Sequence, residues 1–158
     1  NNGLIPIVAY NYGAGKRSRL VKAIKCSLVY AFMLLFVGFV VFETVPEVLL
    51  GMFEASDEML AIGVPALHII GVHFLVAWFC IIAGSVFQAL GNGVYSLVVS
   101  VARQLVVLLP VAFLLSKLGG LHAVWWAFPI AEVMSLCVST LFMIRINQKV
   151  ISNVPDNV

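Results

Sequence analysis

The sequence has 158 residues, of which 63% are hydrophobic and 10% are charged, and its formal net charge is +2. Soluble domains are about 45–50% apolar and about 25% charged, so this composition excludes an ordinary water-soluble fold. Membrane lipid must be the solvent for most of the apolar surface. The small net charge gives no support for nucleic-acid binding.

The first apolar segment is too short to cross a membrane. Residues 3–12 read GLIPIVAYNY, whereas a span needs about 20 residues, so we predict that residues 1–12 are the tail of a preceding helix. A turn containing two glycines and two basic residues follows. The next apolar run predicts a first span over residues 23–42, with Lys22 and Lys25 reaching back to the lipid headgroups.

An acidic segment separates the first predicted span from the second. Residues 43–58 carry five acids and no Lys or Arg, which indicates an aqueous loop with a short interfacial stretch. The second span is predicted over residues 62–90, and Pro65 inside it predicts a kink or a tilt. The sequence Gly-Asn-Gly at 91–93 then predicts a tight turn.

Two further apolar runs predict a third span over residues 95–115 and a fourth over residues 121–144, joined by the short turn SKLGG. Short turns make successive spans antiparallel neighbours. The polar tail 145–158 is expected to leave the membrane and fray. The predicted fold class is therefore all-α, a polytopic transmembrane helical bundle of four spans.

Basic residues predict the orientation of the chain. Both flanks lie on one side of a four-span bundle, and with the 91–93 loop that side collects seven basic residues, against Lys117 alone on the other. The seven are Lys16, Arg17, Arg19, Lys22, Lys25, Arg145 and Lys149. This positive-inside bias predicts a multi-pass protein of the cell membrane with both ends cytoplasmic. Trp125 and Trp126 then lie at the outer interface or line a substrate cavity.

Glu132 is the candidate site residue that costs most to bury, because it falls deep within the fourth predicted span. Such a carboxylate must face protein or water, or carry a proton. Ser135 and Ser139 follow at helical spacing and place Glu132 on a polar stripe that faces the bundle. Glu132 is either a proton or cation site or a structural partner. Arg103, inside the third span, is a possible ion-pair partner, for which we favour a structural role.

The second predicted span contributes three more polar candidates. His68 and His73 are five residues apart, 140° around a helix, so they do not share a face or form an i, i+4 metal pair. Either could titrate, or be neutral and hydrogen-bonded within the bundle. Gln88 is a candidate for an interhelical hydrogen bond. The sequence contains no Walker loop, no nucleotide fingerprint, no Ser/His/Asp set and no His/carboxylate metal cluster. We therefore expect a passive or ion-coupled machine, not an enzyme, with no cofactor and no metal site.

Three segments resemble one family of membrane transporters. The opening GLIPIVAYNYGAGKRSRLVKAIK is similar to the end of the eighth helix of multidrug and toxic compound extrusion (MATE) transporters. The run SVFQALGNGVYSLVVSVARQLVVLLPVAFLL resembles their tenth and eleventh helices, and WWAFPIAEV resembles their twelfth. The combination points to the bacterial branch that contains MepA-like efflux proteins.

This resemblance implies a fold and a function. Residues 1–158 would form part of the C-terminal lobe of a twelve-helix transporter, with the remainder of the same chain as partner. The transporter would exchange external Na⁺ or H⁺ for cationic, amphipathic drugs. Glu132 and His73 are then candidates for ion coupling, and Trp78 and Gln88, with His73, for the wall of the substrate cavity.

One departure from the family pattern and two alternatives remain. Some members carry a carboxylate on the tenth helix as part of a cation site, whereas residues 61–90 here contain no Asp or Glu. This favours a coupling site in the other lobe. The alternatives are a lipid-linked oligosaccharide flippase of the same superfamily and a small four-helix membrane scaffold or subunit.

Overall fold

The computed structural model describes residues 2–155, and this range folds into helices without a strand. The predicted ranges 1–12 and 145–158 reach beyond it at Asn1 and at residues 156–158, which lie outside the described residues. The elements are α1 (Leu4–Gly13), α2 (Arg17–Thr44), α3 (Pro46–Gly51), α4 (Asp57–Ala89), α5 (Gly93–Val101), a π-helix (Ala102–Leu108), α6 (Leu109–Val124), α7 (Ala127–Lys149) and a 3₁₀ turn (Ile151–Asn153).

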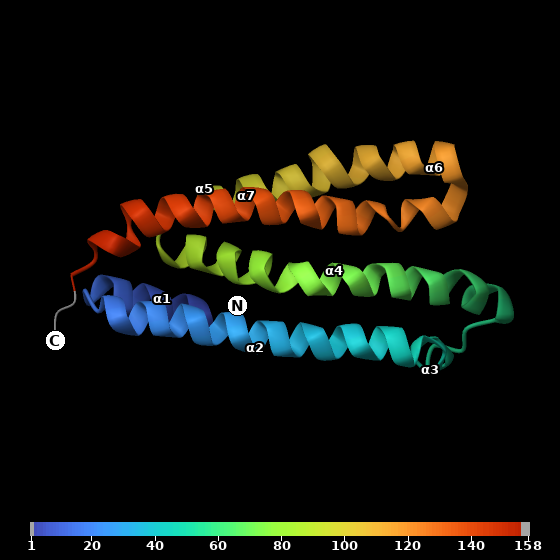
Figure 1. Ribbon diagram of the computed structural model, residues 1–158, viewed down its shortest axis with the longest axis horizontal. Helices are drawn as coiled ribbons and strands as arrows, with labels where there is room; N and C mark the ends of the chain where they lie inside the picture. The colour runs from blue at the N-terminus through green and yellow to red at the C-terminus, as the bar shows by residue number, and fades with distance from the viewer. Residues whose placement is uncertain (1, 156–158) are drawn as a thin grey trace.

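Four helical stretches are long and apolar enough to cross a membrane, and they cover residues 17–44, 57–89, 93–124 and 127–153. This confirms the predicted all-α, multi-pass membrane fold. Figure 1 shows the long helices running side by side, with α4 between α2 on one side and α7 on the other. The segment from α5 to α6 packs on α7, and α1 packs on the beginning of α2.

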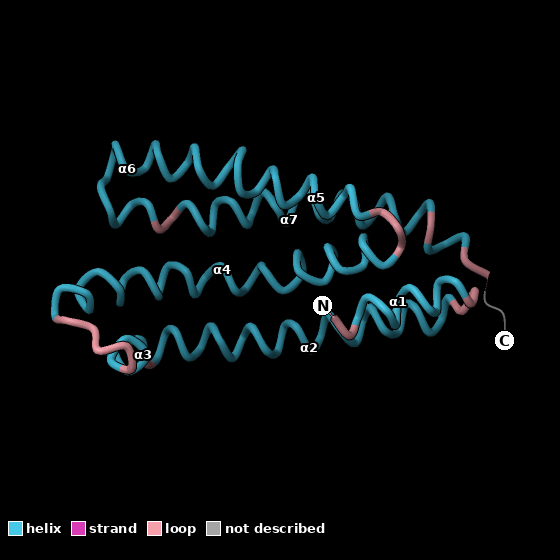
Figure 2. Tube along the Cα trace, turned by 180° about the vertical axis from the view of Figure 1, so that it is seen from behind, coloured by secondary structure: helices cyan, strands magenta, loops and turns pink. Residues whose placement is uncertain are grey.

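The two ends of the bundle differ in charge. The turn after α1, the loop between α4 and α5 and the end of α7 lie together at one end, which we call the basic end (Figure 1). Short helix α3 and the connection between α6 and α7 lie at the other, the acidic end, as the reverse view in Figure 2 also shows. Seven of the nine Lys and Arg residues, all except Arg103 and Lys117, therefore belong to one end of the folded chain.

The acidic segment is more helical than predicted. The sequence pattern predicts a loop over 43–58, but α2 continues to Thr44, α3 forms a further short helix, and α4 begins at Asp57. Ser56 caps α4 by accepting a hydrogen bond from the backbone N–H of Met59 at 3.3 Å. Asp57 and Glu58 in the first turn are favourable next to the positive end of the helix dipole.

The connection between the third and fourth spans turns at Gly120. Its backbone has φ 65° and ψ −158°, non-helical values inside a segment that is otherwise helical. A residue without Cβ adopts this conformation at little cost. The turn predicted from SKLGG therefore lies at its last glycine.

The tail differs from the prediction that it would fray. Helix α7 continues to Lys149, and Ile146 and Ile151 are buried with Leu4, Val8 and Leu20 in one hydrophobic cluster. The apolar residues of this polar segment thus join a cluster to which α1, α2 and α4 also contribute. The polar composition of the segment does not indicate that these side chains are buried. Their burial stabilises the basic end of the bundle.

Helices α2 and α4 approach closely where α4 has a glycine. A Cβ on Gly71 would lie 3.4 Å from Glu43 Oε1 and 3.4 Å from Phe42 Cβ. Small residues of this kind allow close helix packing in membranes, where van der Waals contact replaces the hydrophobic effect between helices.

We expect Gly71→Leu to destabilise the bundle by about 1–3 kcal/mol, the usual cost of overpacking. Thermal unfolding of the purified protein in detergent measures this loss. Gly93→Leu is the matched control, because a Cβ on Gly93 has no neighbouring atom within 4 Å. Equal melting temperatures for the two variants would contradict the close packing.

Candidate functional site

Glu132 lies on the buried face of α7. The exposed fraction of Glu132 is 1%, that of Ser135 is 1% and that of Ser139 is 0%. Positions 132, 135 and 139 share one helical face, and this face packs on α4 and on the π-helix. The polar stripe predicted from the sequence therefore faces into the bundle.

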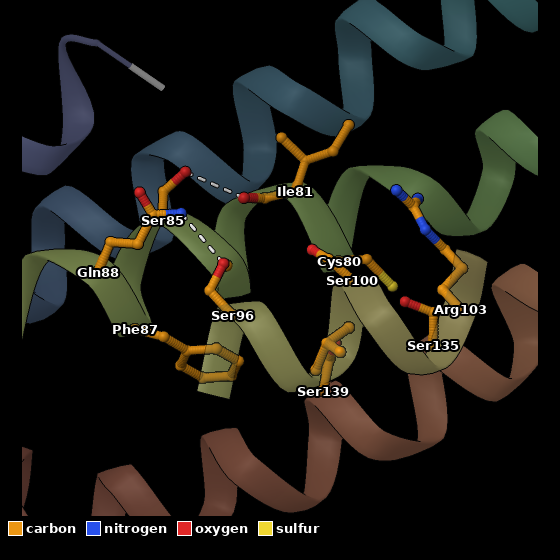
Figure 3. A pocket seen from close by; sticks show the side chains of 12 residues that line it. Cys80, Ile81, Ser85, Phe87, Gln88, Ser96, Ser100, Arg103, Ser135 and Ser139 are labelled. Carbon is orange, nitrogen blue, oxygen red and sulfur yellow. Dashed lines mark hydrogen bonds between the residues drawn. The ribbon is translucent and has the colours of Figure 1, made fainter. Parts of the chain in front are cut away.

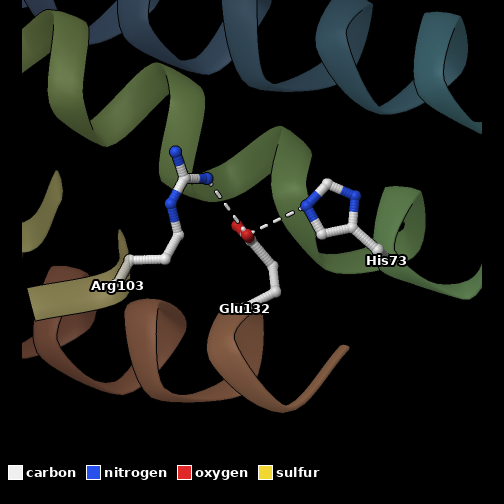
Figure 4. Close-up of polar contacts among 3 residues, drawn as sticks. All are labelled: His73, Arg103 and Glu132. Atoms are coloured by element: carbon white, nitrogen blue, oxygen red, sulfur yellow. Dashed lines mark hydrogen bonds and ion pairs between the residues drawn. The ribbon is translucent and has the colours of Figure 1, made fainter. Parts of the chain in front are cut away.

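Two side chains from other helices meet the Glu132 carboxylate. Arg103 Nη1 lies 3.2 Å from Glu132 Oε2, and His73 Nε2 lies 3.0 Å from the same oxygen. Figure 4 shows the three side chains converging from α4, the π-helix and α7. The possible ion pair with Arg103 is thus formed. A guanidinium compensates the charge of a carboxylate that lipid would otherwise penalise by several kcal/mol.

An irregular turn carries Arg103. Residues Ala102–Leu108 form a π-helix, in which the Leu109 N–H donates to Gln104 O, five residues back. Pro110 follows, and in a regular α-helix its ring would collide with the carbonyl four residues earlier. The wider turn makes room for the ring. π-Turns are rare and often mark functional sites. Because a proline ring does not fit a regular α-helix, Pro110 is the residue in the sequence that indicates this irregularity.

Several buried polar atoms around Glu132 remain unsatisfied. Within the described residues, Glu132 Oε1, His73 Nδ1 and the hydroxyls of Ser135 and Ser139 have no partner beyond the thiol of Cys80. Cys80, on α4, lies against Glu132 and both serines. A thiol is a weak hydrogen-bonding group. Buried hydroxyls normally have stronger partners, and ordered water is the usual substitute when protein supplies none.

Two cavities lie beside the Arg103–Glu132 ion pair; Arg103 lines both, and Glu132 lines only the second. The first, which we call the serine cavity, has a volume of about 210 Å³ and is shown in Figure 3. Its polar lining comprises Cys80, Ser85, Gln88, Ser96, Ser100, Arg103, Ser135 and Ser139. The second, the histidine cavity, has a volume of about 170 Å³ and is lined by His73, Arg103, Gln104, Leu108, Phe128, Ala131 and Glu132.

The other predicted site residues lie apart from Glu132. Gln88 lines the serine cavity and donates to the Ser96 hydroxyl at 3.0 Å. Trp78 packs edge-on against Phe32 of α2, with ring centroids 5.5 Å apart, and lines neither cavity. The prediction that His68 and His73 face different directions is confirmed, because each contacts a different helix.

A second histidine–carboxylate pair was missed by the sequence analysis. His68 Nδ1 lies 2.8 Å from Glu43 Oε2, and both side chains are about one-third exposed. Because the acidic pattern predicts a loop that includes Glu43, its position at the end of α2 opposite His68 was not recognised. Among residues 2–155, no group of three or more His, Cys, Asp or Glu side chains is placed to hold a metal ion.

Arg103→Ala should destabilise the protein by on the order of 3 kcal/mol, because it leaves a buried carboxylate without its compensating charge. Adding Glu132→Gln should recover part of this loss. Unfolding in a double-mutant cycle measures the coupling, and exposed Arg145 provides the matched control, Arg145→Ala. Strictly additive effects of the Arg103 and Glu132 changes would show that the ion pair contributes nothing.

Comparisons with known proteins agree on one family. The sequence model of the MatE family matches residues 1–114. The multidrug export protein MepA of Staphylococcus aureus is 26% identical over 142 residues, which cover 90% of this chain and 31% of MepA. MepA of Staphylococcus saprophyticus is 24% identical, with 89% and 31% covered.

Solved structures of MATE transporters are also similar to this chain. The MATE multidrug transporter DinF-BH superposes with a TM-score of 0.83 at 35% identity. The match covers 91% of this chain and 32% of DinF-BH. The chain thus spans about a third of the length of the relatives it matches, which are named as export proteins and transporters and not as enzymes. Because the family model covers more than half of its residues, the chain belongs to the MATE family.

Proposed function

We propose that this chain forms part of a multidrug efflux transporter that works by secondary active antiport. Family membership and the names of the relatives, multidrug export protein and multidrug transporter, support this proposal. The chain would supply part of the C-terminal lobe of a twelve-helix protein, and the remainder of the same polypeptide would complete the transport path. Cationic, amphipathic drugs are the proposed substrates.

The observation that carries the antiport proposal is the cluster formed by buried Glu132 with partly exposed Arg103 and His73. Arg103 and Glu132 neutralise one another, and the imidazole of His73 contacts the same carboxylate oxygen as Arg103. An ionisable cluster inside a membrane-embedded bundle commonly belongs to an ion pathway. The imidazole favours H⁺ as the coupling ion, and Na⁺ is the alternative.

Aromatic side chains support the proposed substrate class. Trp78 contacts Phe32, which in turn stacks with Phe36 at a centroid distance of 5.8 Å. Phe32 and Phe36 are 42% and 44% exposed, so the rings are open to whatever packs beside α2. Aromatic faces attract organic cations. Trp78 is therefore retained as a proposed substrate contact, together with Gln88.

Glu132→Gln in the complete transporter should reduce drug efflux by about tenfold or more, since couplings between sites are typically 1–3 kcal/mol, or 5–150-fold. Efflux of a fluorescent cation is followed in vesicles with an imposed H⁺ or Na⁺ gradient, which also identifies the ion. Glu58→Gln is the control, because Glu58 is an exposed acid at the start of α4. Unchanged efflux in Glu132→Gln vesicles would remove this residue from the coupling mechanism.

Membrane orientation can be tested separately. We propose that the basic end faces the cytoplasm of the cell membrane, following the positive-inside rule. A fluorescent protein that folds only in the cytoplasm, fused after Val158, should be bright. A periplasmic phosphatase fused at the same position should be inactive, and an active phosphatase would reverse the proposed orientation.

A further inference from the structure

The serine and histidine cavities lie on opposite sides of the Arg103–Glu132 ion pair. In α4, His73 lines the histidine cavity and residues 80–88 line the serine cavity. In α7, residues 128–132 line the histidine cavity and residues 135–139 line the serine cavity. Both helices run from the acidic end to the basic end (Figure 1), so the serine cavity lies nearer the basic end on each.

The third helical segment gives the same order. The chain from α5 to α6 runs in the opposite direction, towards the acidic end. Its residues 96–103 line the serine cavity and residues 103–108 line the histidine cavity. The lining residues of all three helical segments therefore give the same order. The two cavities follow one another along the bundle, with Arg103 between them. From Cys80 to Gln88 the serine cavity follows α4 for about 12 Å.

The serine cavity is suited to water. The hydroxyls of Ser135 and Ser139 are buried against it with no partner beyond a thiol, and its volume of about 210 Å³ exceeds the roughly 30 Å³ that one water occupies in the liquid. Gln88 and Ser100 lie exposed at its margin. Hydroxyl groups, which both donate and accept, can continue a hydrogen-bonded chain of water.

We propose that the two cavities are water-filled half-channels through which protons reach and leave Glu132 and His73 from opposite ends of the bundle, with Arg103 as the barrier between them. This inference rests on the proposed ion-coupled function and adds its route. The titratable groups that face Glu132 are His73 and Cys80 from α4 and Arg103 from the π-helix.

Each transfer moves one proton and needs no other reactant. A proton from water in the histidine cavity binds to the His73–Glu132 pair. One proton later leaves the pair and passes to water in the serine cavity. The fixed positive charge of Arg103 opposes direct passage of a hydrated proton or metal cation from one cavity to the other, as a pore-lining arginine does in channels that exclude protons. Transfer between the cavities is thereby confined to the His73–Glu132 pair, which exchanges protons with one cavity at a time.

Native Cys80 provides a reporter in the serine cavity. The experiment uses the complete transporter with every other cysteine replaced, including Cys26→Ser and Cys137→Ser, and the membrane-impermeant reagent 2-sulfonatoethyl methanethiosulfonate. A second protein carries Ala131→Cys with Cys80→Ala and reports on the histidine cavity. Ile82→Cys in the same background is the control, because Ile82 is 7% exposed and lines neither cavity.

Labelling rates are measured in inside-out and right-side-out vesicles. Cys80 should react at least about tenfold faster from the side of the 91–93 loop, and Ala131→Cys at least about tenfold faster from the opposite side, since a charged reagent needs a watery path. Rates for both reporters equal to that of Ile82→Cys would overturn the proposal. So would reaction of both reporters from the same side.

A proton-leak measurement tests the barrier. Arg103→Gln transporters in proteoliposomes should dissipate a pH gradient faster than the unchanged protein, and Arg103→Lys, which keeps the charge, should restore the seal. If Arg103→Gln does not fold, the labelling rates decide alone. If the two cysteine reporters react from opposite sides while Glu132→Gln transporters show normal efflux, the half-channels are supported and the coupling role of Glu132 is overturned. Loss of efflux in Glu132→Gln without opposite-sided labelling would overturn only the half-channels.

Discussion

A carboxylate surrounded by lipid-embedded helices must be compensated, and this requirement organises the centre of the bundle. Glu132 is almost fully buried, and it is held by Arg103 from the π-helix and by His73 from α4. Without these partners the ionised group would cost several kcal/mol, more than most single packing contacts contribute. The ion pair therefore ties the π-helix to α7, and the contact of His73 with the same carboxylate ties α4 to α7.

Around this polar centre, packing rather than hydrophobicity holds the helices together. Lipid tails are as apolar as leucine, so helix association depends on close contact. Gly71 lets α2 approach α4, and the cluster of Leu20, Phe87 and Ile146 closes the basic end. The serine cavity interrupts this packing with polar groups, which is tolerable only if water completes their hydrogen bonds.

The spans were predictable because their signal is composition, which follows directly from the length of the hydrocarbon core. The burial of Glu132 with Ser135 and Ser139 was predictable because helical periodicity determines which residues share a face. The contact between His73 and Glu132, 59 residues apart, was not, since helix rotation is set by tertiary packing. The π-turn that carries Arg103 and the pairing of Glu43 with His68 also depend on geometry that one sequence does not specify.

The two histidines of α4 connect this helix to a different neighbour on each side. His68 is tied to Glu43 of α2, and His73 is tied to Glu132 of α7, with contacts of 2.8 and 3.0 Å. Their directions differ by about 140° around the helix axis. A twist of α4 about its axis would therefore strain both ties at once. In this arrangement the two contacts together set the rotation of α4 about its axis relative to α2 and α7.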